Sequence, residues 1–246
     1  MYKKTPPLTL ISIFIISFIL SWIIQKDGVI ANDILVSGEK LYSEHNEELI
    51  IRDFFKDRRD GFFVDVGCAH YRDASTTFYL EKHLGWSGIA VDAIVDWAKD
   101  YMENRPKTKF YNFIVTDHSG KTESFYRSGD NMFLSSKYKS FIDWAAEEKG
   151  HIQANYSIVY VPTITLTELL DKSGITKIDF LSIDIEGTEP TALAGFDINR
   201  FKPELVCIEA YSNKDKIMRY FSGHGYKRVE KYLKYDTVNW YFTPKN

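Results

Sequence analysis

The chain has 246 residues, enough for one α/β domain with a short appendage and too few for two enzyme domains. With 44% hydrophobic and 26% charged residues, its composition is close to that of globular proteins and excludes disordered, collagen-like and coiled-coil classes. A net charge of −3, without a basic block, argues against a nucleic-acid partner.

An uncharged apolar segment, Leu8 to Ile24, stands apart from this average composition. At about 1.5 Å per residue it would be roughly 26 Å long, near the lower limit for a hydrocarbon core of about 30 Å. We therefore expect residues 1–27 to form an N-terminal membrane helix that anchors the chain, with the membrane as a partner through residues 8–24. Residues 28–47 then form a juxtamembrane linker, and residues 48–246 form the folded domain.

A cleaved signal peptide is the alternative for the same segment. Lys3 and Lys4 provide a basic start, and Val29-Ile30-Ala31 resembles a cleavage site. If the segment is retained, the positive-inside rule places Lys3 and Lys4 in the cytosol and the domain across the membrane. Because only a few charges set this orientation, the side on which the domain lies stays open.

The first half of the domain alternates apolar runs with amphipathic windows, a pattern typical of a parallel sheet with crossover helices. The sequence predicts a helix over 48–56, a strand over 61–66, a helix over 75–84, a strand over 88–91, a helix over 94–104, a strand over 110–115, and an edge strand or hairpin arm over 120–126.

The second half continues the alternation and then changes character. It predicts helices over 138–149, 166–172 and 214–221, with Thr165 as a cap, and strands over 178–185, 204–209, 226–233 and 238–243. The last two strands are expected to pair antiparallel. A mostly parallel sheet with helices on both faces, finished by such a pair, is the plan of the class I methyltransferase variant of the doubly wound, Rossmann-like α/β fold.

Acidic side chains lie at the carboxyl ends of the predicted parallel strands, where open α/β sheets bind their ligands. In chain order they are Asp65, Asp92, Asp117, Asp184, Glu186 and Glu209. Any one of them has a structural alternative, since an aspartate after a strand often caps the next helix. Acidic residues after successive strands exceed what solubility requires and predict a polar site.

The loop after the first strand offers a single glycine, Gly67, whereas a pyrophosphate cradle needs several. S-adenosylmethionine has no phosphate and needs one tight turn and an acidic residue for its ribose diol. Gly67 and Asp92 supply both, so we expect this cofactor, with Asp117 at the adenine and Asp65 fixing the loop or receiving the amino group. The expected cofactor contacts are Asp65, Gly67, Cys68, Ala69, Asp92, Ala93, Asp117 and Asp184.

Several stretches carry a family resemblance. The most specific is the run Ile183 to Glu189 (IDIEGTE), which follows the first-strand motif Phe62 to Gly67. Further matching stretches are Ser43 to Arg52, Tyr79 to Lys82, Leu84 to Ile89, Val161 to Leu166 and Val206 to Glu209. Over nearly the whole domain the chain resembles the FkbM-type methyltransferases, a family of class I S-adenosylmethionine-dependent enzymes. Ala69-His70 and residues 73–76 depart from the common family pattern.

The resemblance implies O-methylation of a hydroxyl on a small molecule, a glycan or a lipid-linked sugar. Methyl transfer from a sulfonium is an in-line displacement, so the protein positions donor and acceptor and removes one proton. We expect Asp184 and Glu186 to act as base and orienter, with His70 as a further candidate base. The two carboxylates could instead hold a divalent ion, but no motif supplies further ligands and we expect no metal.

A non-catalytic, membrane-attached module that keeps the fold to bind a glycan or a protein is the alternative function. The departure at Ala69-His70 favours it, while the intact Asp65, Asp92 and Asp184 argue against it. No oligomeric state is indicated.

The two cysteines, Cys68 and Cys207, are expected to be free thiols. If the fourth strand lies between the first and the fifth, they are nearly 10 Å apart, beyond the roughly 7 Å that a disulfide allows between Cα atoms.

Overall fold

The computed structural model describes residues 34–129, 131–150 and 153–245. The chain divides into two units, residues 1–39 and residues 40–246. In the first, the described helix is α2 (Ile34–Ser37). The apolar segment Leu8 to Ile24 lies outside the described residues, and no helix within them is long and apolar enough to span a membrane. The N-terminal membrane helix therefore stays a prediction.

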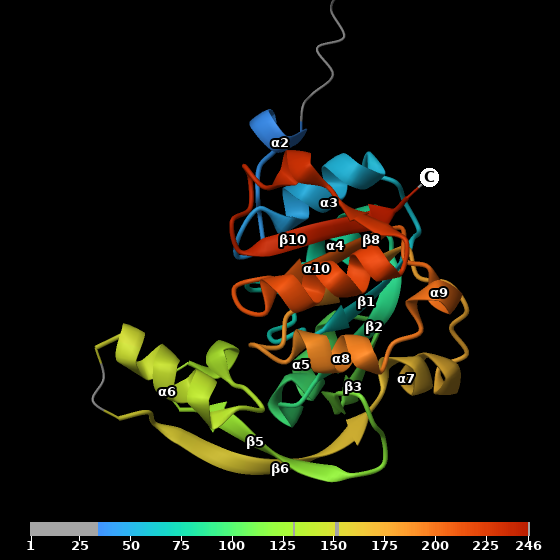
Figure 1. The fold of residues 1–246 in the computed structure, drawn as a ribbon. Helices are drawn as coiled ribbons and strands as arrows, with labels where there is room; N and C mark the ends of the chain where they lie inside the picture. The colour runs from blue at the N-terminus through green and yellow to red at the C-terminus, as the bar shows by residue number, and fades with distance from the viewer. Residues whose placement is uncertain (1–33, 130, 151–152, 246) are drawn as a thin grey trace, which may run out of the picture. The chain divides into compact units, whose positions relative to one another are not determined.

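The second unit is built on a sheet that has seven strands within the described residues (Figure 1). Their spatial order is β3 (Thr108–Asn112), β2 (Ser87–Asp92), β1 (Phe62–Val66), β7 (Phe180–Ile183), β8 (Leu205–Glu209), β10 (Asn239–Pro244) and β9 (Tyr226–Arg228). Neighbours from β3 to β8 are parallel, and β10 runs antiparallel to both β8 and β9. The predicted α/β sheet with its antiparallel end is confirmed.

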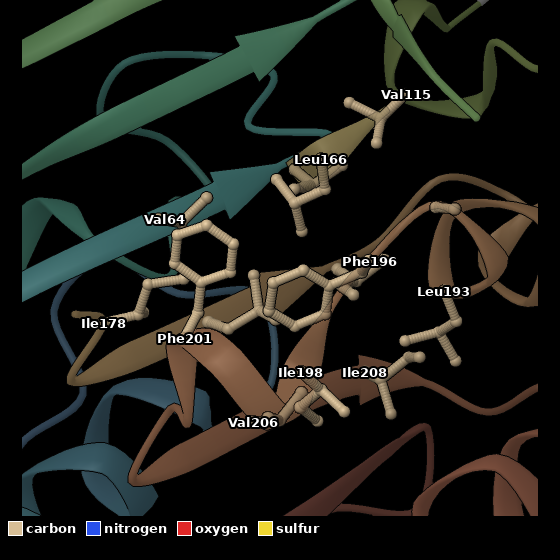
Figure 2. Packing of buried hydrophobic residues seen from close by; sticks show 14 of the residues in the cluster. Val64, Val115, Leu166, Ile178, Leu193, Phe196, Ile198, Phe201, Val206 and Ile208 are labelled. Atoms are coloured by element: carbon tan, nitrogen blue, oxygen red, sulfur yellow. The ribbon is translucent and has the colours of Figure 1, made fainter. Parts of the chain in front are cut away.

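Helices cover both faces of this sheet, so the side chains of β1 are buried on both sides. Val64 and Val66 belong to a large apolar cluster on one face, which Figure 2 shows from close by. This cluster is packed by α7 (Leu166–Lys172), α8 (Glu189–Ala194), α9 (Ile198–Phe201) and α10 (Lys214–Gly223). On the opposite face, Tyr101 of α5 (Ala98–Asn104) packs with Ala90 of β2, and α3 (Glu47–Phe55) contacts β8. The guanidinium of Arg105 lies over the rings of Phe63 on β1 and Phe78 of α4 (Phe78–Leu84).

A buried arginine ties the second set of helices to the first strand. Arg105 Nε donates to Glu81 of α4 at 2.6 Å, and its Nη2 donates to the Thr77 hydroxyl at 3.2 Å. Thr77 Oγ1 in turn donates to Asp65 on β1 at 2.7 Å. A buried charge requires a full set of hydrogen-bond partners, so this network holds β1 and the loop that follows it in place.

Local signals explain some of the helix boundaries. Thr165 accepts the Glu168 amide at 3.1 Å, as predicted for a cap, and Gly85 ends α4 at φ 77°. The helix predicted from residue 75 begins at Phe78, because the Ser75 hydroxyl accepts the Phe78 amide at 3.1 Å. Residues 40–47, assigned to a linker on sequence, belong to the compact unit: both oxygens of Glu48 accept amides of that stretch.

A second sheet has the order β4 (Ile114–Val115), β6 (Tyr156–Ile164) and β5 (Thr122–Ser128), with α6 (Lys139–Glu148) beside β5 (Figure 1). The strand predicted over 110–115 is therefore wrong as one element. The strand is interrupted at Phe113, whose amide donates to Asp92 O at 3.1 Å. The next strand, β4, lies outside the main sheet and pairs with β6.

Some elements differ from the sequence prediction or were missed. The strand β6 and the helices α8 and α9 were not predicted as separate elements, and β9 ends at Arg228, followed by the 3-10 turn η3 (Glu230–Tyr232) instead of more strand. The remaining 3-10 turns are η1 (Val95–Trp97) and η2 (Met132–Leu134). Both cysteines are free and buried, as expected.

Candidate functional site

The loop after β1 is held against the neighbouring strands by backbone contacts. Gly67 has φ 82°, and a Cβ built on it would lie 1.7 Å from Asp184 O, so only glycine fits. Ala69, also in the left-handed region at φ 46°, donates its amide to Asp92 Oδ2 at 3.0 Å. Asp92 Oδ1 accepts the Ile94 amide at 2.7 Å. One carboxylate therefore joins the ends of β1 and β2.

Three hollows open around these strand ends. The first, the nonpolar cavity, lies between the ends of β1 and β2 and the strands β4 and β5. Its walls include Gly67, Ala69, Asp92, Ala93, Ile94, Trp97, Phe113, Ile114, Phe125, Phe133, Lys137, Asp184 and Glu186. Trp97 brings a buried Nε1 donor that has no hydrogen-bond partner in the described structure. A flat aromatic group with a polar edge suits such walls.

The second hollow, which we call the acidic cavity, lies beside the loop after β1 that contains Gly67. It is lined by Glu44, Asp65, Gly67, Cys68, Ala69, Ala74, Thr76, Phe133, Ser182, Asp184 and Glu186. Burial raises the pKa of Asp65 to about 6 despite the hydrogen bond from Thr77. With several carboxyl groups on its walls, this cavity suits a positively charged ligand.

The third hollow, the aromatic cleft, has rings and acids on its walls. It is lined by Tyr138, Ser140, Phe141, Trp144, Glu186, Gly187, Glu209, Tyr211 and Ser212. The Trp144 and Tyr211 rings lie 5.2 Å apart between centroids, and Tyr211 is 60% exposed. Exposed rings beside carboxylates offer a surface for an acceptor that has both apolar and hydroxyl groups.

The carboxylates between these hollows have strongly perturbed acidities. Burial, followed by the charge of Glu189, raises the pKa of Asp184 to about 8. Burial and the Asp184 charge raise the pKa of Glu186 to about 9 and that of Glu209 to about 10. Asp184 is itself exposed and lines two cavities, and the cavity walls together with the carboxylates around it disfavour its charged form.

Most of the residues predicted for the site come together. Asp65, Gly67, Cys68 and Ala69 line the acidic cavity, Asp92 and Ala93 line the nonpolar cavity, and Asp184 and Glu186 line both. Their predicted roles as cofactor contacts, base and orienter remain predictions, but the strand ends do converge.

His70 and Asp117 are not brought to either cavity. His70 Nδ1 accepts the Asp73 amide at 2.9 Å, and its ring packs against Trp97 at 5.7 Å between centroids. Asp117 is half exposed and pairs with His118 at 2.7 Å. The interruption at Phe113 moves Asp117 away from the end of β3, which is why it does not line the nonpolar cavity; its role at an adenine stays a prediction.

Several wall residues were missed on sequence. Lys137, Trp144 and Tyr211 belong to segments far apart in the chain, so no local pattern links them. Glu189, a buried neighbour of these walls, had a detectable signal because it ends the IDIEGTE run. Glu209 was named on sequence among the strand-end acids but was not assigned a role in the site.

Comparison with known proteins agrees with this geometry. The profile of the methyltransferase FkbM domain matches residues 65–228, which include the loop after β1 and the strand ends described above. The chain belongs to the FkbM methyltransferase domain family. Its class is therefore that of the class I methyltransferases, and its cofactor is S-adenosylmethionine.

Solved structures show more distant similarity. A TehB-like S-adenosylmethionine-dependent methyltransferase from Corynebacterium glutamicum aligns over 93% of this chain and 99% of its own, with 12% identity and a TM-score of 0.45. A precorrin-6y C5,15-methyltransferase from Geobacter metallireducens aligns over 75% and 79%, with 12% identity and a TM-score of 0.40. Curated proteins give no sequence match. The assignment rests on the family match rather than on these structures.

Proposed function

We propose that the chain transfers a methyl group from S-adenosylmethionine to a hydroxyl oxygen of an acceptor bound in the aromatic cleft. The acceptor class is a small molecule, a glycan or a lipid-linked sugar. The observation that carries this proposal is the position of Glu186, which alone among the described residues lines all three hollows. A carboxylate placed between a donor cavity and an acceptor cleft is suited to remove the hydroxyl proton.

The chain's residues fit the cofactor in parts. The adenine suits the nonpolar cavity, between Ile94 and the rings of Trp97 and Phe113. The ribose hydroxyls suit Asp92, whose oxygens keep lone pairs beyond the two amides that they accept. The methionine portion suits the acidic cavity, which Gly67 and Ala69 line and whose carboxyl groups suit its ammonium group.

The reaction needs orientation and one proton acceptor. S-adenosylmethionine supplies a methyl group on a positively charged sulfur. The acceptor oxygen forms the new bond to the methyl carbon while the carbon–sulfur bond breaks and leaves its electron pair on sulfur. Glu186 accepts the hydroxyl proton. Its pKa, raised to about 9, makes it a stronger base than an exposed glutamate, and a nearby positive sulfur favours ionisation of Asp184 and Glu186.

The backbone at Glu186 is also unusual. Its φ of 54° is rare for a non-glycine residue, and Ser136 Oγ donates to its carbonyl at 3.0 Å. Such a conformation costs about 1–3 kcal/mol and persists where surrounding contacts hold it. This supports a functional role for the side-chain direction that it sets.

The test is a labelled-methyl transfer assay with the full-length chain in detergent. A panel of hydroxylated aglycones, free sugars and lipid-linked sugars is incubated with methyl-tritiated cofactor. We expect label on at least one acceptor, and Glu186→Gln should lose transfer while it keeps cofactor binding. If calorimetry shows no binding at cofactor concentrations near 1 mM, the enzyme reading is wrong and the non-catalytic module takes its place.

The same proposal includes attachment to a membrane through Leu8 to Ile24, whose length and lack of charge support it. Such an anchor would keep the aromatic cleft near lipid-linked acceptors. In membranes washed with alkaline carbonate, the full chain should stay in the pellet and a chain lacking residues 1–33 should be released. Release of both would contradict the anchor.

A further inference from the structure

Three carboxylates form a compact group at the wall between the acidic cavity and the aromatic cleft. We call Asp184, Glu186 and Glu209 the carboxylate cluster. One oxygen from each lies within 4.8 Å of the other two. Among the described residues, the charges that act on them most strongly are carboxylates: Glu44, Glu47, Asp65, Glu189 and one another. Lys137, which shares the nonpolar cavity with Asp184 and Glu186, is paired with Glu123 at 2.6 Å. Such an arrangement lacks its counter-charge.

A fourth acid approaches the cluster from within the fold. Glu189 is fully buried, and its Oε1 accepts the amides of Ile185 at 3.2 Å and Gly187 at 3.0 Å. Its Oε2 is buried without a hydrogen-bond donor, and its carboxyl group contacts that of Glu209. Two carboxyl groups in contact need either a shared proton or a neighbouring cation. This buried oxygen is independent of the cavity lining, and a cation bound beside Glu209 would supply the positive charge that it lacks.

The donor set selects the kind of cation. All three ligands are carboxylate oxygens, with no histidine or cysteine in the group, which favours hard ions over zinc or copper. Oxygens within 4.8 Å of one another reach a common ion at a Ca–O distance of roughly 2.4 Å or a Mg–O distance of about 2.1 Å after small side-chain rotations that bring them closer together. A single ammonium group would leave most of the negative charge uncompensated.

We propose that Asp184, Glu186 and Glu209 bind a divalent cation of the Mg²⁺, Mn²⁺ or Ca²⁺ class. Because Glu186 and Glu209 also line the aromatic cleft, the free coordination positions face the place where an acceptor enters. The role of the ion, unlike its binding, rests on the proposed methyl transfer. An acceptor with two adjacent oxygens, such as a vicinal diol, binds the ion through both. Coordination lowers the pKa of the reacting hydroxyl, and its proton passes to the uncoordinated oxygen of Glu186.

The experiment measures metal binding without turnover. Full-length chain in detergent is stripped with a chelator and titrated with MnCl₂ while free Mn²⁺ is followed by electron paramagnetic resonance. We expect one site per chain that excess Mg²⁺ or Ca²⁺ competes for. Glu209→Gln should weaken Mn²⁺ binding at least tenfold. Glu103→Gln, the same change at an exposed glutamate of α5, is the matched control and should bind like the original chain.

Two results overturn the cation site. One is the absence of stoichiometric Mn²⁺ binding up to 1 mM, as expected if an amine or shared protons occupy the cluster. The other is equal affinity of Glu209→Gln and Glu103→Gln. Circular dichroism verifies that both variants are folded. Calorimetry with S-adenosylmethionine on the same samples separates the two claims: cofactor binding without Mn²⁺ binding removes only the ion, and Mn²⁺ binding without cofactor binding removes only the methyl transfer.

Discussion

Asp92 offers the sharpest test of the cofactor cavity, because one side chain joins two strand ends and lies on the cavity wall. Replacing it with alanine removes the acceptor for the Ala69 and Ile94 amides and the expected partner of the ribose diol. Asp100→Asn on α5 is the matched control, since it removes the same charge outside all three hollows.

The magnitude follows from the contacts. A hydrogen bond to a charged group contributes about 1.5–3 kcal/mol, so losing the ribose contact should weaken cofactor binding by about 1–3 kcal/mol, or roughly 5- to 150-fold. The free energy of unfolding should change by less than the loss of two hydrogen bonds would imply. Burial that raises the pKa of Asp92 from 3.8 to about 6 opposes its ionisation by about 3 kcal/mol, and the substitution removes this cost.

Calorimetry of S-adenosylmethionine binding to the full-length chain measures the effect. Because ribose hydroxyls donate to the ionised carboxylate, the affinity of the original chain should also fall as the pH drops through about 6. The Asp92→Ala chain should lack this pH dependence. Equal affinities of Asp92→Ala and Asp100→Asn would refute the reasoning and move the ribose elsewhere.

Three further predictions concern stability and are measured by urea unfolding. Gly67→Ala should destabilise the chain by at least about 2 kcal/mol, because the added Cβ would overlap Asp184 O. The control Gly120→Ala, at φ 80° in open space, should cost only about 1 kcal/mol, and equal losses for the two variants would contradict the close-approach argument. Arg105→Leu should cost about 3–5 kcal/mol because it leaves its buried partner Glu81 uncompensated, whereas Arg200→Leu at an exposed pair should cost at most about 1 kcal/mol. A small effect at Arg105 would show that the buried network does not hold the loop after β1. Without divalent ions, the raised folded-state pKa values of the carboxylate cluster stabilise the fold at low pH, so the free energy of unfolding should fall as the pH rises from about 4 through about 8 to 10; a curve that rises over that range would contradict the burial of these acids.

The main sheet could be predicted because its strands are buried on both faces. Runs such as Phe62 to Val64 and Leu205 to Ile208 are apolar on successive residues, and the helices between the strands repeat at helical spacing. The strand β6 lacks this signal. Its side chains alternate between a covered and a solvated face, but Ile158 and Tyr160 on the solvated face are 49% and 74% exposed, so the sequence shows no apolar–polar alternation.

The site could be predicted as far as it depends on strand ends. Asp92 and Asp184 follow buried parallel strands directly, and the topology brings them to one edge. The rule that strand-end residues converge on one edge does not apply to Asp117, because it assumes an unbroken strand and the chain leaves the main sheet at Phe113. The aromatic cleft depends on how α6 packs near the segment after β8, and tertiary packing of that kind leaves no periodic trace in the sequence.

The most direct test of the central claim is a crystal structure of the chain with S-adenosylhomocysteine. We expect its ribose hydroxyls within hydrogen-bond distance of Asp92, its adenine beside Trp97 and Phe113, and its sulfur directed toward Glu186. A ligand bound outside the nonpolar and acidic cavities, or one whose sulfur faces away from the aromatic cleft, would contradict the account.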